Sequence, residues 1–381
     1  MQKHDQFNLT LADSQATAVT PVKVHNFDIA RYEAYAQQLE ERCRRFVEAP
    51  QGVLVYRRMR VAEVFSYGCS DMRSSLEWQL GALEKSMAFE ADVPNFLEPW
   101  YGIGTIASAF GFDYLWNPGQ APAVNGRFSS VEKLLEAAFQ PVAETPVGRH
   151  TIEMTEYFLN ATKGRIPMSD CDIQSPLNIA GNVVDINNFF MDMVLNPDGV
   201  REAFDRIAAL HIDFMKRLQY LIGDALVRPG HGFASAKAFE GMGMSDDNAV
   251  MISGDMYTEL AVPALVKACD PFGGPVFHSC GNWSDKKHAV LSIPGLKCAD
   301  GAFSLATDPD ANSTEGFAEA FANTGVVLNA RIVGKPEVIA QKVRELWRPG
   351  MKLIVVTYCE TPAEQSEAYR IIHDQVKAME R

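Results

Sequence analysis

The residues best suited to chemistry lie in one short stretch, GGPVFHSCGNWS, at positions 273–284. Its first half is apolar and predicts a short buried strand, with His278 and Cys280 at the carboxyl end of that strand, before a Gly-Asn turn. Side chains two positions apart project from the same face of a strand, so this imidazole and thiol can reach one small ion. Such a nitrogen and sulfur pair suits zinc, although two ligands alone do not make a site.

The elements that must position this pair alternate along the chain. Strands are expected in the segments RIPMSDCDI, ASAKAFEG, PVFHSC, LKCADGAF, TGVVLNARI and KLIVVTYC, with amphipathic helices between them. Buried strands alternating with helices imply a parallel sheet, and the strand count favours a closed (β/α)8 barrel over an open sheet. We expect residues 91–381 to form this TIM barrel. Residues 1–90 are expected to form a tail and a helical extension, with helices starting after Asp28 and at a Ser75 cap.

The barrel prediction decides which of the seven cysteines could complete the site. Active sites of barrels collect where strands run out into the loops that follow them. Cys359 ends the expected strand KLIVVTYC, whereas Cys298 comes early in LKCADGAF and should lie well below the mouth. We therefore predict that Cys359, and not Cys298, is the third ligand beside His278 and Cys280.

Composition excludes several classes of protein. The 381 residues are 47% hydrophobic, carry a net charge of −13 and contain no basic run, which argues against a nucleic-acid partner. No export signal and no apolar run of membrane-spanning length is found, so we expect no membrane partner and place the chain in the cytoplasm. The odd, scattered cysteines are typical of reduced thiols.

At this point a resemblance becomes specific. His278-x-Cys280, followed after 78 residues by Cys359, resembles the H-x-C-xn-C zinc motif of corrinoid-dependent methyltransferases in the uroporphyrinogen decarboxylase superfamily. The segments MISGDMYTELAVPAL, NARIVGKPEVIAQKVREL and DIQSPLNIA are also similar to that family, so the likeness covers roughly residues 90 to 381. A (β/α)8 barrel is the fold that this resemblance implies.

The resemblance also implies a function. We expect a catalytic Zn²⁺ with one open position, and methyl transfer between a corrinoid (cobalamin, free or on a carrier protein) and a small thiol or methoxylated substrate. The direction of transfer stays open. One alternative is decarboxylation of a porphyrinogen, although the arginine segment of true decarboxylases, resembling R-Q-A-G-R, is not found in this sequence. Another is a barrel of the same superfamily that binds a ligand without catalysis.

Further residues are assigned by position. Glu240, at the end of ASAKAFEG, is the candidate catalytic acid or exchangeable ligand, with a solvated loop carboxylate as the alternative. Asp300 and Asn329, on late strands, are expected to hydrogen-bond substrate or a metal ligand. His211 and His231 are interpreted as helix-face and loop residues.

An aromatic pair beside a carboxylate adds a candidate pocket wall. Glu98, Trp100 and Tyr101 precede two glycines that permit close approach of a ligand, and we expect all three to bind substrate. Aromatic core residues at a strand end are the alternative.

Overall fold

The fold is built around a parallel sheet. The computed structural model describes residues 15–64, 70–116 and 122–380. Within these ranges six parallel strands pair in the order β1-β8-β7-β6-β5-β4, and a short antiparallel pair, β2-β3, stands apart. The strands are β1 Gly52–Arg57, β2 Asp113–Leu115, β3 Ala123–Asn125, β4 Met242–Ser245, β5 Pro275–His278, β6 Cys298–Ala302, β7 Val327–Ile332 and β8 Lys352–Thr357.

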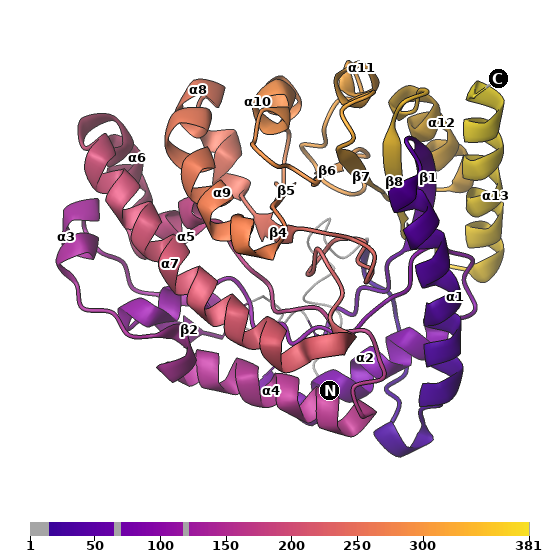
Figure 1. Ribbon diagram of the computed structural model, residues 1–381, viewed down its shortest axis with the longest axis horizontal. Coiled ribbons are helices and arrows are strands. Elements are labelled where there is room, and N and C mark those ends of the chain that lie inside the picture. Colours follow the sequence, from indigo (N-terminus) through magenta and orange to yellow (C-terminus); the bar gives the residue numbers. More distant parts are fainter. Residues whose placement is uncertain (1–14, 65–69, 117–121, 381) are drawn as a thin grey trace.

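Helices cover the outside of this sheet. The helices are α1 Ile29–Glu48, α2 Met72–Ser86, α3 Val131–Glu136, α4 Pro146–Thr162, α5 Pro176–Val183, α6 Ile186–Leu195, α7 Pro197–Ile222, α8 Gly254–Met256, α9 Val262–Cys269, α10 Lys287–Leu291, α11 Phe317–Phe321, α12 Pro336–Leu346 and α13 Pro362–Met379. In Figure 1 the strands form an arc from β4 to β1, and α8 to α13 with α1 lie along its outer side. Helices α2, α4 and α7 lie across from the arc.

The predicted α/β class and parallel sheet are confirmed, but the described residues form no closed eight-stranded ladder. Single parallel bridges continue the arc instead: Leu97 pairs with Met168, Met168 with Leu226, and Gln174 with Ser245. The expected strands RIPMSDCDI and ASAKAFEG therefore contain isolated bridges and no strand. In the first, Pro167 has no N–H to donate to a ladder, which weakens strand pairing there.

The sheet begins earlier in the chain than we expected. Strand β1 comes from the segment that we predicted to be a helical extension, and it pairs along its whole length with β8, from Gly52–Lys352 to Arg57–Thr357. The helices before and after β1 are present as predicted. Asp28 caps α1 by accepting from the backbone N–H of Arg31, but Asp71, and not Ser75, caps α2.

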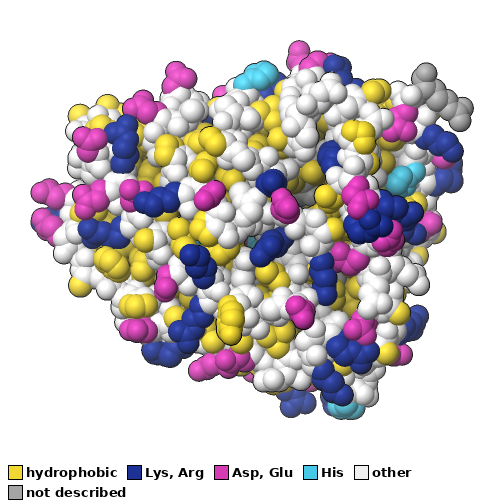
Figure 2. Space-filling view, viewed as in Figure 1, with side chains coloured by type: hydrophobic (Ala, Val, Ile, Leu, Met, Phe, Trp, Pro, Cys, Tyr) yellow, Lys and Arg dark blue, Asp and Glu magenta, His cyan; other side chains and the backbone are white. Residues whose placement is uncertain are grey.

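Surface chemistry is mixed. Figure 2 shows Lys and Arg interspersed with Asp and Glu over the face in view, with hydrophobic side chains between them. None of the helices in the described ranges is long and apolar enough to cross a membrane.

Candidate metal centre

His278 stands at the end of β5 and is held by a buried carboxylate. Its Nδ1 lies 2.6 Å from Oδ2 of Asp300, which projects from the neighbouring strand β6 at the paired position. Because Nδ1 is engaged, Nε2 is the ring nitrogen that faces the loop, and it lies 3.5 Å from Sγ of Cys280. The two residues are therefore neighbours at one strand end, and their role as metal ligands stays a prediction.

Asp300 joins three strands at this point. Besides the imidazole on β5, it accepts hydrogen bonds from Nδ2 of Asn329 and, at 2.9 Å, from Nε of Arg331, both on β7. Burial raises the pKa of the Asp300 carboxyl, but Arg331, His278 and Asn329 outweigh burial and lower this pKa to about 2. Asp300 therefore stays charged and holds the imidazole at Nδ1, and its supporting role beside a metal ligand stays a prediction.

The protonation of His278 follows from this environment. Burial lowers the pKa of the imidazole, but the hydrogen bond and the charge of Asp300, with Cys280, raise it to about 10. A ligating imidazole must be neutral at the ligating nitrogen, so binding of a metal displaces this proton.

Sequence reasoning missed Asp247, the third member of the group. Asp247 follows β4 by two residues, and its Oδ1 accepts from the backbone N–H of Cys280 at 2.7 Å and lies 3.8 Å from Nε2 of His278. One ligand atom from each of Asp247, His278 and Cys280 lies within 4.8 Å of the others, so these three residues could hold a metal ion. The sequence feature that could have pointed to Asp247 is its position just after a strand, but β4 itself was not predicted.

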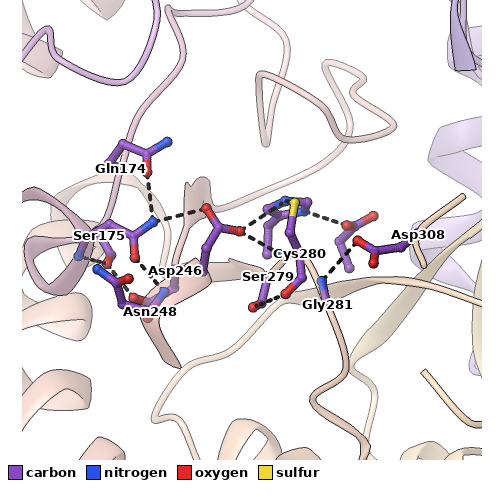
Figure 3. Close-up of polar contacts among 12 residues, drawn as sticks. Gln174, Ser175, Asp246, Asn248, Ser279, Cys280, Gly281 and Asp308 are labelled. Atoms are coloured by element: carbon purple, nitrogen blue, oxygen red, sulfur yellow. Dashed lines mark hydrogen bonds and ion pairs between the residues drawn. The ribbon is translucent and has the colours of Figure 1, made fainter. Parts of the chain in front are cut away.

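A network of polar side chains positions Asp247. Its Oδ2 accepts from Nδ2 of Asn178, which also donates to Oε1 of Gln174. Next to it, Asp246 accepts from the hydroxyls of Ser175 and Tyr257. Figure 3 shows Gln174 and Ser175 on one side of the Cys280 thiol and Asp308 on the other.

Hydrogen bonds fix the loop on the carboxyl side of Cys280. The backbone N–H of Gly281 donates to Asp308, and that of Trp283 to Asn312. The Trp283 ring packs edge-on against Phe277 of β5, with ring centres 5.4 Å apart, and is fully buried. Packing and hydrogen bonds therefore hold the thiol, and a metal site would not have to order a loose segment.

The structure does not bring Cys359 into this group. Cys359 was predicted to end the last strand and instead follows β8 by two residues, and its thiol is not within 4.8 Å of both other predicted ligand atoms. It lines a cavity of about 510 Å³ with Arg57 and Lys335, and burial raises the pKa of its thiol to about 11. Cys298 starts β6 and lines a different cavity, beside Lys352 at the start of β8.

Glu240 lies at the wrong end of the sheet for catalysis at this centre. It precedes β4 by two residues, and its carboxylate pairs at 2.9 Å with Lys297, which directly precedes β6. Both residues therefore mark the amino ends of the strands, opposite to His278. The error follows from the strand that was expected in ASAKAFEG and did not form.

Glu98 and Trp100 meet around an unexpected partner, His231. Glu98 Oε2 lies 2.9 Å from Nδ1 of His231, and the Trp100 ring stacks on the same imidazole with centres 5.9 Å apart. Phe233, two residues further on, packs edge-on against His278, so this second cluster borders the candidate metal centre. His231 was interpreted as an isolated loop residue because its carboxylate partner is 133 positions away.

Tyr101 belongs to a separate aromatic group. Its ring centre lies 4.6 Å from that of His150 and 5.4 Å from that of Trp116. These residues line another cavity, of about 580 Å³, with Asp113 and Tyr114 of β2. The three residues that we expected to form one pocket wall are therefore divided between two places.

Polar residues at the carboxyl ends of parallel strands occupy the usual active-site position of barrel-type α/β proteins, and comparison with known proteins makes the class specific. The family model for uroporphyrinogen decarboxylase (URO-D) matches residues 53–369. The chain belongs to this family, as the sequence motifs predicted. All of β1 except Gly52 lies within the match, which starts earlier than the likeness that we had identified.

Structural comparison points to the same fold. A methyltransferase from Methanosarcina mazei matches with a TM-score of 0.64 at 15% sequence identity, over 89% of this chain and 99% of the other. No curated protein matches the chain in sequence. At this identity the likeness concerns the fold.

Proposed function

We propose that this protein is a zinc-dependent methyltransferase that moves a methyl group between a corrinoid and a thiol or methyl-ether substrate. The observation that carries the proposal is the convergence of Asp247, His278 and Cys280 at the carboxyl ends of β4 and β5. Their donor set of oxygen, nitrogen and sulfur suits zinc. Ligands at about 2.1 and 2.3 Å from a tetrahedral ion lie roughly 3.6 Å apart, which agrees with 3.5 Å between Nε2 and Sγ.

The protein's own groups prepare this centre. Asp300 fixes the imidazole so that Nε2 points to the metal position, and the N–H of Cys280 orients Asp247. Three protein ligands leave one position for the substrate, the arrangement of a catalytic zinc. When bound, zinc would lower the pKa of a substrate thiol or stabilise the leaving oxygen of an ether. Free cobalamin or a corrinoid carrier protein would be the partner that donates or accepts the methyl group.

Cys359 is the second candidate for the third ligand. Like Cys280, it follows a strand of the same sheet by two residues, so both thiols belong to the same edge of the sheet. Ligation by Cys359 would need its side chain to leave the cavity that it lines with Arg57. The two possible ligand sets, with Asp247 or with Cys359 as the third ligand, differ in which alanine variant should lose zinc.

Zinc content tests the site. We expect about one zinc per chain in the wild type and loss of zinc in Cys280→Ala. Loss in Asp247→Ala with retention in Cys359→Ala would support the three-residue group, and the reverse would assign Cys359. Cys298→Ala is the matched control because this thiol lies at the other end of the sheet. Stoichiometric zinc in Cys280→Ala would contradict the proposal.

Methyl transfer tests the reaction. The full chain is mixed with methylcobalamin and a thiol, or with cob(I)alamin and a methyl ether, and the visible spectrum of the corrinoid is followed. We expect turnover that Cys280→Ala abolishes. Release of carbon dioxide from uroporphyrinogen without any corrinoid reaction would instead support the decarboxylase alternative.

A further inference from the structure

An aromatic cavity lies apart from the candidate metal ligands, none of which is among the described residues that line it. It has a volume of about 580 Å³, and five rings line it, those of Tyr101, Phe112, Tyr114, Trp116 and His150. The Tyr101 ring stands at 88° to the Trp116 ring, with centres 5.4 Å apart, and the centre of the Tyr114 ring lies within 6.0 Å of both. The rings therefore present aromatic surface to the cavity in more than one orientation.

The chain around the cavity holds its rings in place. Tyr114 is the central residue of β2 and pairs with Val124 of β3. Its hydroxyl donates to the carbonyl of Gly102 and lies 3.1 Å from Oγ1 of Thr105. A side chain at Gly104 would be crowded, because its Cβ would lie 3.3 Å from the Tyr114 ring and 2.9 Å from Val124. The ring is thus fixed by the protein, and a ligand would not have to order it.

The charge of the lining favours a cation. Among the described residues that line the cavity, Asp113 is the one with a carboxylate, and none is Lys or Arg. Burial lowers the pKa of His150, so its imidazole is neutral at pH 7. The other two cavities differ, since Arg57 and Lys335 line one and Lys352 lines the other. An anion would therefore find no opposite charge in the described lining of the aromatic cavity, whereas a cation would find Asp113.

We propose that the aromatic cavity binds an organic ammonium ion with a methylated or quaternary nitrogen. The faces of Tyr and Trp rings attract a cation within about 6 Å of their centres, and the exposed Asp113 adds a full negative charge. A quaternary nitrogen has no N–H to satisfy, so it enters an aromatic site at a lower desolvation cost than a primary ammonium. The inference goes beyond the proposed methyl transfer, because it needs neither a metal nor a corrinoid.

A pair of isosteres tests the role of charge. Choline and 3,3-dimethyl-1-butanol have the same shape and differ in a nitrogen against a carbon. Titration calorimetry on the full chain, at constant ionic strength, measures the binding of each. We expect choline to bind about tenfold more tightly than the neutral alcohol, as a partly desolvated cation beside aromatic rings should. No binding of choline, or equal affinities for the two probes, would overturn the proposal.

Ring variants assign the preference to the cavity. Trp116→Leu should weaken choline binding by about tenfold, whereas Tyr114→Phe keeps the ring and should retain the affinity. Tyr220→Leu is the matched control and should have no effect, because it removes a ring on α7 that is 91% exposed. Unchanged binding of choline in Trp116→Leu would overturn the proposal.

A charge variant covers the case in which Trp116→Leu does not fold. Asp113 is exposed, so Asp113→Asn should fold, weaken choline binding by about threefold and leave the neutral alcohol unchanged. Asp198→Asn, at a carboxylate on α7 whose side chain is 95% exposed, is the control and should change neither affinity. Equal weakening of both probes in Asp113→Asn would contradict charge recognition and overturn the proposal.

The variant Cys280→Ala separates this site from the candidate metal centre. Choline binding should persist in Cys280→Ala whether or not this variant has lost zinc, because Cys280 does not line the aromatic cavity. Choline binding without any methyl transfer would therefore retain the ammonium site and remove the methyltransferase. Loss of choline binding in folded Cys280→Ala would place the ammonium at the metal centre and overturn the inference.

Discussion

At the scale of single residues, Asp300 has the widest influence on the centre. Its two oxygens serve an imidazole, an amide and a guanidinium from two neighbouring strands, so one carboxylate joins a candidate metal ligand to two side chains of β7. Asp247 differs from Asp300 because one of its own oxygens is a candidate metal ligand and lies beside the other two candidate ligand atoms. Substitutions of the two aspartates should therefore have different effects on zinc.

Asp300→Asn should weaken zinc binding by about tenfold to a hundredfold without abolishing it. The amide keeps the shape of the side chain but removes the charge that fixes His278 Nδ1. Competition with a metal-sensitive chelator dye measures the affinity. Asp310→Asn, an exposed residue in the loop after β6, serves as control, and unchanged affinity in Asp300→Asn would contradict the orienting role.

His211 should make stability depend on pH. This side chain is fully buried on α7, with Nε2 3.1 Å from Sδ of Met242, and burial lowers its pKa to about 3. The unfolded chain has a His pKa of about 6.5, so between these values the unfolded state binds more protons and stability falls as pH falls. From pH 7 to pH 5 this group should cost about 2 kcal/mol.

The variant His211→Leu isolates that contribution. It removes the titrating group, so the difference in unfolding free energy between wild type and variant should shift by about 2 kcal/mol in favour of the variant between pH 7 and pH 5. Urea unfolding at both pH values measures it. An equal difference at the two pH values would show that His211 does not titrate as described.

At the scale of elements, one buried carboxylate joins both ends of the chain to the sheet. Asp92 accepts from the backbone N–H of Val55 on β1, from Tyr369 and His373 on α13 and from Arg42 on α1. Burial raises the pKa of Asp92, but His373 and the other partners lower it below the ordinary value. Two helices and a strand thus share one acceptor.

Removal of this acceptor should loosen all three elements. Asp92→Ala leaves several buried donors without a partner, and we expect a loss of about 3 kcal/mol in unfolding free energy. Urea unfolding followed by circular dichroism checks the value. The exposed Asp205, which pairs with Lys267, is the matched position, and Asp205→Ala should cost less than about 0.5 kcal/mol.

The elements also show what could be predicted from the sequence and why the rest could not. Strands β5 to β8 are apolar or flanked by clear turns, so their ends were located to within about three residues, and His278 and Cys280 were placed at the carboxyl end of β5. Strand β1 was missed because GVLVYR is short and stands between helical patterns. Asp247 was missed with β4, whose sequence MGMS has neither alternation nor β-branched residues.

Contacts between distant residues were the other limit. The pairing of His231 with Glu98 joins positions 133 apart, and no local pattern encodes it. Cys359 was placed at the correct end of β8, but its side chain lines a cavity beside Arg57, which no local pattern indicates. Strand ends are thus predictable from local periodicity, whereas the direction of a side chain at such an end depends on tertiary packing.

At the scale of the whole molecule, metal binding should stabilise the fold. The donor atoms come from segments after β4 and β5, which meet only in the folded chain. A ligand that binds only the native state at a thousandfold excess over its dissociation constant adds about 4 kcal/mol. The thermal midpoint should therefore rise with Zn²⁺ and fall on chelation, whereas Cys280→Ala should show neither change. A midpoint independent of Zn²⁺ in the wild type would contradict a native metal site.

Of the cysteines in the described ranges, Cys280 is exposed and the others are buried. An alkylating reagent such as iodoacetamide should therefore attack Cys280 first, and a bound ion would shield the sulfur from it. Peptide mass mapping after brief alkylation would then report the fraction of molecules that carry metal. The same exposure makes this sulfur the first place where peroxide would damage the protein, so inactivation during aerobic handling would begin at the centre itself.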